Sequence, residues 1–148
     1  MMNLPNPKIF IPAVAAMTIL IALLCASLAR AESQEQIIAE VIAAEAAGEG
    51  ERGLLAVACV IANRAKAQYK TPYQIVTAKN QFYGLTAKNR HKLYAAVKPI
   101  ADRLARDIMR LEDITGGALY FRTEKERLFP WTKPENKTVK IGNHIFYK

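Results

Sequence analysis

The chain has 148 residues, 51% of them hydrophobic, and a formal net charge of +8 at pH 7. The first 31 residues carry only two charges, Lys8 and Arg30, so the remaining 117 hold 19 basic and 13 acidic side chains, enough for one domain with a modest core. The basic charge favours an anionic partner. Because the sequence has no arginine-rich helix and no glycine-aromatic strand motif, we expect no nucleic-acid partner.

Residues 1–31 are typical of a targeting segment. The uncharged run 9–29 follows Lys8 and ends at Ala29-Arg30-Ala31, an A-x-A-type cleavage signal. This pattern predicts export to the periplasm or cell wall, with a mature domain of residues 32–148. If residues 1–31 are not cleaved, the 21 residues of run 9–29 are long enough to serve as a membrane anchor.

The first helix of the predicted domain is expected from Ser33 to about Ala47. Ser33 followed by Gln36 three residues later is a capping-box pattern that marks a helix start. After this helix, the stretch Gly48 to Glu51 is expected to form a flexible acidic loop.

Glu45 shares one face of this helix with three apolar residues, as the spacing of Ile38, Val41, Ile42 and Glu45 indicates. A carboxyl group on an apolar stripe is costly unless it is paired or protonated. Partial desolvation raises the pKa of a carboxyl group and suits it to general-acid catalysis near neutral pH. Glu45 is therefore a candidate catalytic acid, and a solvated or arginine-paired carboxylate is the alternative.

Two further helices are predicted before residue 80. Residues 52–66 contain the run Leu54 to Ala62, which is apolar on every side and marks a helix at the centre of the domain. Cys59 lies inside this run and is expected to be a buried, inert thiol. Thr71 and Pro72 then begin a short helix that is expected to end near Lys79.

The last third of the chain changes from helical to strand patterns. A helical stretch is expected over residues 89–111, and Pro99 must either kink it or start a second helix. Residues 118–121 read as a short strand, and Gly142-Asn143 is a two-residue hairpin signal that places Ile141 opposite His144. Helices followed by a small antiparallel sheet predict an α+β fold that is mostly helical.

Several strings resemble the cell wall hydrolases of the spore-cortex-lytic type (SleB-like). They occur in that family's order and reach from about Glu35 to Tyr147. They comprise residues 43–49 (AAEAAGE), 57–64 (VACVIANR), 81–82 (QF), 115–121 (TGGALYF) and 141–147 (IGNHIFY). The loop around Glu49 departs from the family pattern, because residues 48–50 read Gly-Glu-Gly instead of a proline-containing turn.

The resemblance implies a small lysozyme-like domain that cleaves the glycan strands of peptidoglycan without a cofactor or metal. It implies that Glu45 is the catalytic acid, in the manner of a lytic transglycosylase that forms 1,6-anhydro ends. Peptidoglycan is then the expected partner, and we expect a monomer. Glu49 and Glu51 are the nearest candidates for the second carboxylate that a hydrolytic glycosidase needs, although solvated or ion-paired loop acids are the default.

The candidate substrate-binding residues are aromatic rings that could stack on sugars and polar groups that could bind N-acetyl and hydroxyl groups: Gln81, Phe82, Tyr120, Trp131 and His144. Phe82 and Tyr120 could equally be core residues, Trp131 could pack under Pro130, and His144 could make a structural hydrogen bond.

Three alternatives remain open at this stage: a hydrolytic muramidase, an amidase that cuts the peptide stem, and a wall-binding module without chemistry. A zinc amidase would need a cluster of histidine and carboxylate ligands, whereas His91 and His144 stand far apart without a spaced motif. A binding module would give no reason for a glutamate at position 45.

Overall fold

The structure is a computed structural model that describes the backbone of residues 10–148 and the side chains of residues 15–25 and 34–148. The chain divides into two compact units, Met1–Ser33 and Gln34–Lys148. Helix α1 spans Phe10–Ala46. Among the described residues, no helix is both long enough and apolar enough to cross a membrane. The predicted cleavage signal at residues 29–31 lies outside the residues whose side chains are described.

The predicted helix start at Ser33 is wrong. Helix α1 passes through this position, and Gln36 donates from Nε2 to Glu40 Oε1 at 3.0 Å instead of closing a capping box. Residues 29–36 contain no glycine or proline, and most of them are good helix formers, so nothing in the sequence stops the helix there.

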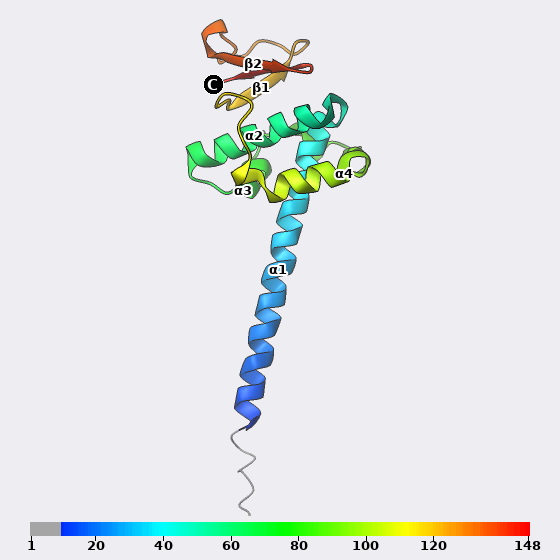
Figure 1. Cartoon of the computed structure of the whole chain (residues 1–148), viewed down its shortest axis with the longest axis vertical. Coiled ribbons are helices and arrows are strands. Elements are labelled where there is room, and N and C mark those ends of the chain that lie inside the picture. The colour runs from blue at the N-terminus through cyan, green and yellow to red at the C-terminus, as the bar shows by residue number, and fades with distance from the viewer. Residues whose placement is uncertain (1–9) are drawn as a thin grey trace, which may run out of the picture. The chain divides into compact units, whose positions relative to one another are not determined.

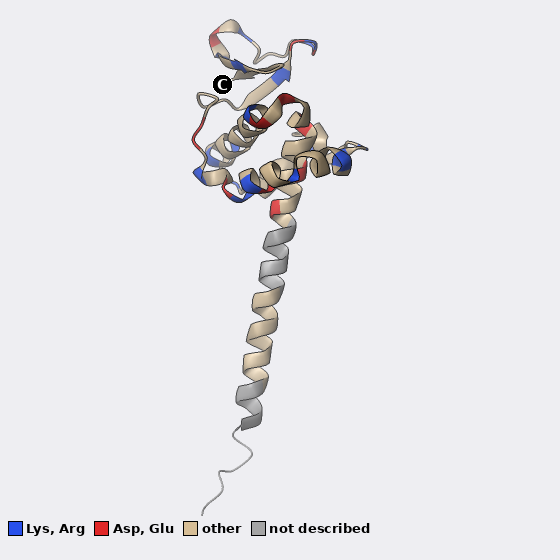
Figure 2. Cartoon of the chain, turned by 45° about the vertical axis from the view of Figure 1, so that its right-hand side comes forward, with Lys and Arg blue, Asp and Glu red and all other residues tan. Residues whose placement is uncertain are grey.

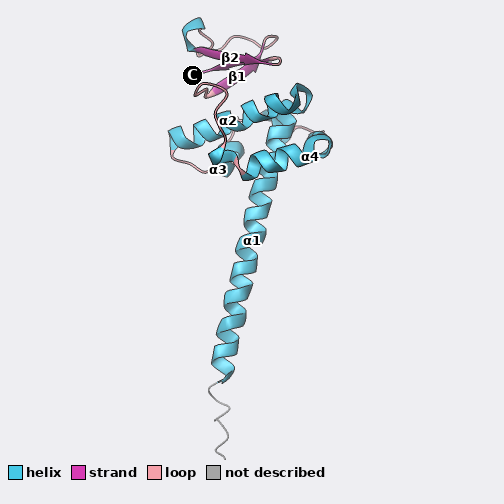
Figure 3. Cartoon of the chain, in the orientation of Figure 1, coloured by secondary structure: helices cyan, strands magenta, loops and turns pink. Residues whose placement is uncertain are grey.

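The second unit, residues 34–148, is the predicted α+β domain, mostly helical with one small antiparallel sheet (Figures 1 and 3). Charged side chains of both signs are spread over its helices and strands (Figure 2). After α1, its helices are α2 (Gly50–Gln68), α3 (Pro72–Thr77) and α4 (Arg90–Arg106), and its strands are β1 (Tyr120–Thr123), β2 (Lys137–Ile141) and β3 (His144–Tyr147).

Helix α2 is the central element, as its apolar run predicts. One side of it packs with α1, α3 and α4 in a core that includes Leu54, Val57 and Ile61. The other side contributes Ala56 and Val60 to a second cluster beneath the sheet. Because both sides of the helix are covered, an all-round apolar sequence is stable here. Cys59 is buried, as predicted.

Local sequence signals set the helix ends around α2. Thr71 caps α3 with both bonds of a capping box: the Thr71 hydroxyl accepts from the Gln74 backbone, and the Gln74 side chain accepts from the Thr71 backbone. Helix α3 ends at Thr77, two residues earlier than predicted. Helix α4 is kinked at Val97, just before Pro99, and gives way to a 3-10 turn at Ile108–Arg110.

The sheet has the strand order β1-β3-β2, with β3 in the centre. Ile141 is directly opposite His144, as the hairpin signal predicts. Strand β1 begins at Tyr120, two residues later than predicted. The preceding carbonyl groups turn toward α2 instead, where Asn63 donates to Ala118 and Arg64 donates to Leu119.

Glu49 fastens the β2–β3 turn to the helices. The predicted flexible loop at residues 48–51 is instead a short 3-10 turn, Ala47–Glu49, that leads directly into α2. From this turn, Glu49 accepts from the Asn143 backbone N–H at 2.8 Å and from Asn143 Nδ2 at 2.9 Å. A Cβ atom on Gly142, which has a φ of +58°, would lie 2.1 Å from Glu49 Oε2. Glycine is therefore required at this turn.

We expect Gly142→Ala to lower the free energy of unfolding by about 2 kcal/mol, because it combines an unfavourable positive φ with displacement of Glu49. Gly48→Ala is the matched control, since a Cβ atom there meets nothing within 4 Å. Urea unfolding of the two variants tests this. Equal stabilities would contradict the close contact between Gly142 and Glu49.

Candidate active site

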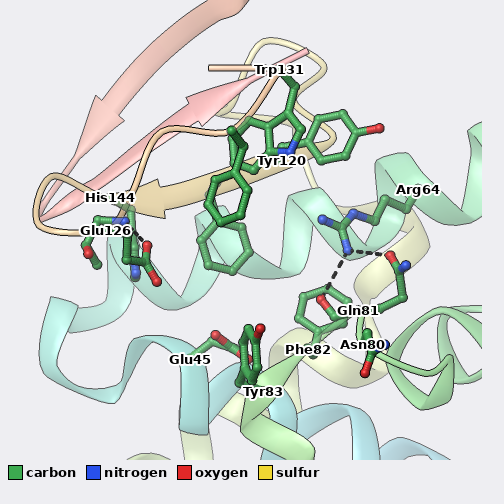
Figure 4. A pocket seen from close by; sticks show the side chains of 13 residues that line it. Glu45, Arg64, Asn80, Gln81, Phe82, Tyr83, Tyr120, Glu126, Trp131 and His144 are labelled. Atoms are coloured by element: carbon green, nitrogen blue, oxygen red, sulfur yellow. Dashed lines mark hydrogen bonds between the residues drawn. The ribbon is translucent and has the colours of Figure 1, made fainter.

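A cavity of about 420 Å³ lies where the helices meet the sheet (Figure 4). Its walls come from α1, α2, β1 and β3, from residues 80–83, and from the segment after β1. All six residues that the sequence singled out line it: Glu45, Gln81, Phe82, Tyr120, Trp131 and His144. The structure thus brings them together across 100 residues of sequence, while their roles remain predictions. A smaller hollow of about 290 Å³ shares Arg64, Gln81 and Tyr120 with the cavity.

Glu45 lies in the last turn of α1 and is half-buried, above a stripe of core residues that contains Ile38, Val41 and Ile42. Its Oε1 atom accepts a hydrogen bond from the Gly84 backbone N–H at 2.6 Å. Burial raises the pKa of the Glu45 carboxyl, and the negative charge of Glu126 adds to this effect. The Gly84 N–H group and the positive charge of Arg64 oppose the rise. The net upward shift favours a carboxyl group that keeps its proton.

Gly84 is at this position because the backbone comes very close to α1. A Cβ atom here would lie 2.9 Å from Ala44 Cβ, 3.0 Å from Glu45 Oε1 and 3.2 Å from the Val41 carbonyl oxygen. Any larger residue would push residues 83–86 away from the helix and lengthen the bond to Glu45. The absence of a side chain therefore sets the position of the Glu45 carboxyl.

Arg64 orients the polar part of the cavity, although it was not among the site residues predicted from the sequence. Its Nη1 donates to Gln81 Oε1 at 3.1 Å, and its Nε donates to the Leu119 carbonyl at 2.5 Å. Its guanidinium carbon lies 4.9 Å from the centre of the Phe82 ring. Phe82 is a core residue as well as a cavity residue, because it is 7% exposed and packs in the helical core. The sequence signals for Arg64 were a charge at the end of an apolar run and a place at the end of the string 57–64 that resembles the family.

Three aromatic rings form one wall of the cavity. Trp131 stacks on Tyr120, with ring centres 5.0 Å apart and an interplanar angle of 16°, and on Phe129 at 5.0 Å and 5°. The main ring contacts of Trp131 are therefore with Tyr120 and Phe129, and not with Pro130. Tyr83, exposed beside Glu45, adds another aromatic ring to the cavity lining (Figure 4). Such a surface is suited to a flat, partly apolar ligand.

His144 is buried at the start of β3, with its ring edge-on to Phe121 at 5.1 Å. Burial lowers the pKa of its imidazole, so the ring is neutral at neutral pH. Among the described residues, no group hydrogen-bonds the buried His144 Nδ1 atom. The structural hydrogen bond considered for His144 is thus not found at Nδ1.

The structure places both sequence candidates for a second carboxylate outside the cavity lining. Glu49 binds Asn143, and Glu51 forms an ion pair with Arg103. The carboxylate that does line the cavity with Glu45 is Glu126, in the turn after β1. No sequence pattern predicts this position, because Glu126 stands among several charged residues between β1 and β2.

The comparisons with known proteins agree with one another. The family model described as cell wall hydrolase matches residues 48–147, a segment that begins three residues after Glu45. The chain is 28% identical to the catalytic domain of the Bacillus cereus SleB protein (TM-score 0.64), over 79% of this chain and 91% of that one. It is 29% identical to the catalytic domain of the germination-specific lytic transglycosylase SleB from Bacillus anthracis (TM-score 0.62), over 78% and 93%. No curated protein sequence matches the chain.

The raised pKa of Glu45 predicts a pH-dependent effect on stability. The folded state keeps this proton at a pH where the unfolded state has lost it, so ionised Glu45 destabilises the fold above its raised pKa but not below 4.5. We therefore expect Glu45→Gln to raise the Tm at pH 7 and to change it little below pH 4. A Tm that falls at pH 7 would show that the ionised carboxylate stabilises the fold instead.

Proposed function

The chain belongs to the cell wall hydrolase family, and on this premise we propose that it cleaves peptidoglycan glycan strands between N-acetylmuramic acid and N-acetylglucosamine. We further propose that it acts as a lytic transglycosylase with Glu45 as general acid and base. The observation that supports this most directly is the position of Glu45. It is a half-buried carboxyl with a raised pKa in a cavity that also has an aromatic wall.

The proposed reaction needs one proton carrier. Protonated Glu45 donates to the glycosidic oxygen, the bond to the muramic acid anomeric carbon breaks, and positive charge develops on that sugar. The 6-hydroxyl of the same sugar attacks the anomeric carbon, and the Glu45 carboxylate takes the hydroxyl proton. The product is a 1,6-anhydro sugar, and no water is consumed. An attack within one sugar ring gains from proximity.

The remaining cavity residues would hold the glycan. The stacked rings of Tyr120, Trp131 and Phe129 offer a platform for sugar faces. Gln81, which is held by Arg64, and the His144 imidazole, which lines the cavity, would offer polar contacts to N-acetyl or hydroxyl groups. The smaller hollow beside Arg64 would extend the groove past a single sugar.

A peptidoglycan substrate places the domain outside the cytoplasm. We propose that residues 1–31 direct export, in keeping with the cleavage signal at residues 29–31. The domain's excess of basic residues would favour the anionic cell wall.

The two other functional classes fit the geometry less well. The two histidines lie apart, because His91 is near Glu40 at the start of α4 whereas His144 is in the cavity. An amidase built on both histidines therefore has no support in this arrangement. A binding module without chemistry would not need a half-buried carboxyl above an apolar core.

The first test is to digest purified peptidoglycan with the full-length chain and to weigh the released muropeptides. We expect 1,6-anhydro ends, and we expect Glu45→Gln to reduce their release by at least about 1,000-fold, because the amide cannot transfer the proton. Full activity of the variant would refute the role of Glu45. Reducing ends in place of anhydro ends would mean that water is the nucleophile.

The aromatic wall gives a second test. Removing the Trp131 ring should raise the apparent KM for soluble glycan strands roughly 3- to 10-fold, with a smaller change in kcat. The matched control is Tyr69→Asn, which removes an exposed aromatic ring outside the cavity at φ +52°, a conformation that asparagine tolerates. Equal KM values for Trp131→Ala and the control would show that the aromatic wall does not bind the glycan.

A further inference from the structure

The cavity contains a second carboxylate, Glu126, which no motif in the sequence indicates. It follows β1 in the turn at residues 124–126, and its Oε2 accepts from the Thr123 backbone N–H at 2.5 Å. Its backbone carbonyl accepts from Arg122 Nη1 at 3.3 Å. The turn is thus tied to the end of β1, and Glu126 lines the cavity with Glu45 and His144 (Figure 4).

The charges around the cavity are unevenly placed. Glu45 and Glu126 are its acidic groups, Arg64 is its one basic side chain, and His144 is neutral because burial lowers its pKa. Glu45 serves as the proton donor in the proposed reaction, and Arg64 is engaged with Gln81 and Leu119. Glu126 is therefore the cavity carboxylate that the proton transfers do not use, and its negative charge is available to a sugar bound between these walls.

We propose that Glu126 is a second catalytic group, whose carboxylate stabilises the positive charge that develops on the sugar as the glycosidic bond breaks. This inference rests on the proposed function. Glu126 neither forms a bond nor moves a proton in this scheme, since Glu45 performs both proton transfers. Its contribution is electrostatic and greatest at the transition state.

Glu126 is exposed in the free protein, so its electrostatic effect there is weak. Substrate binding would strengthen the effect of its charge on the sugar. Water surrounds an exposed carboxylate and weakens its field. A glycan strand that fills the cavity would displace this water from between the carboxylate and the sugar. The same negative charge also helps Glu45 to keep its proton, since it acts on that carboxyl across the cavity.

Glu126→Gln in the full-length chain tests the proposal, because it removes the charge and keeps the shape. We expect kcat on soluble glycan strands to fall by about 10- to 100-fold, with the apparent KM changed less than about twofold. The alkaline limb of the pH–rate profile should move to lower pH, because Glu45 loses a neighbour that favours its protonated form. The products should keep their 1,6-anhydro ends.

Glu124→Gln is the matched control. Glu124 lies in the same turn but pairs with Lys140 at 2.6 Å and does not line the cavity, so the control should keep wild-type kcat. Equal kcat values for the two variants would overturn the proposal, and so would a change in KM alone. Failure of the proposed function would appear separately, as an active Glu45→Gln variant.

Discussion

The bond from the Gly84 backbone N–H to Glu45 Oε1 is the interaction on which the site depends. Burial alone would make a carboxyl above Ile38, Val41 and Ile42 costly and poorly ordered. The Gly84 N–H group fixes its orientation, and the backbone groups of Gly84 and Tyr83 offset part of the desolvation, but the pKa of the carboxyl stays above its ordinary value. Stronger hydrogen bonds to the ionised form would lower this pKa and make the carboxyl less suited to act as an acid. The close approach of residues 83–86 to α1 therefore sets both geometry and protonation.

Helix α2 connects this acid to the rest of the cavity. Its apolar sides hold the helical core and the sheet cluster together, so the two layers cannot move independently without exposing apolar surface. Its polar end also connects the helices to the sheet. Asn63 donates a hydrogen bond to the Ala118 carbonyl and Arg64 donates one to the Leu119 carbonyl, just before β1 begins. Arg64 also orients Gln81. A single helix thus positions both the aromatic wall and the polar groups across from it.

Features with a local cause could be predicted from the sequence. The cap at Thr71, the turn at Gly142-Asn143 and the burial of the central run each follow from a few adjacent residues. Glu45 was also within reach, because helical spacing alone placed it on the apolar stripe. Features that depend on distant residues were missed. Glu49 holds the β2–β3 turn only because Asn143 lies beside it in the fold. Glu126 lines the cavity only because of how the turn after β1 folds.

The hydrogen bonds between Glu49 and Asn143 join residues that are 94 positions apart in sequence. Strand β3, which follows Asn143, is the partner of both β1 and β2, so neither of the earlier strands can pair before it arrives. Contacts of such long range close late in folding, because the loop entropy must be overcome first. By contrast, the helix that carries Glu45 can form from neighbouring residues. A partly folded chain would therefore contain the Glu45 helix without the substrate cavity. Glycan cleavage would then be expected only from the completely folded domain.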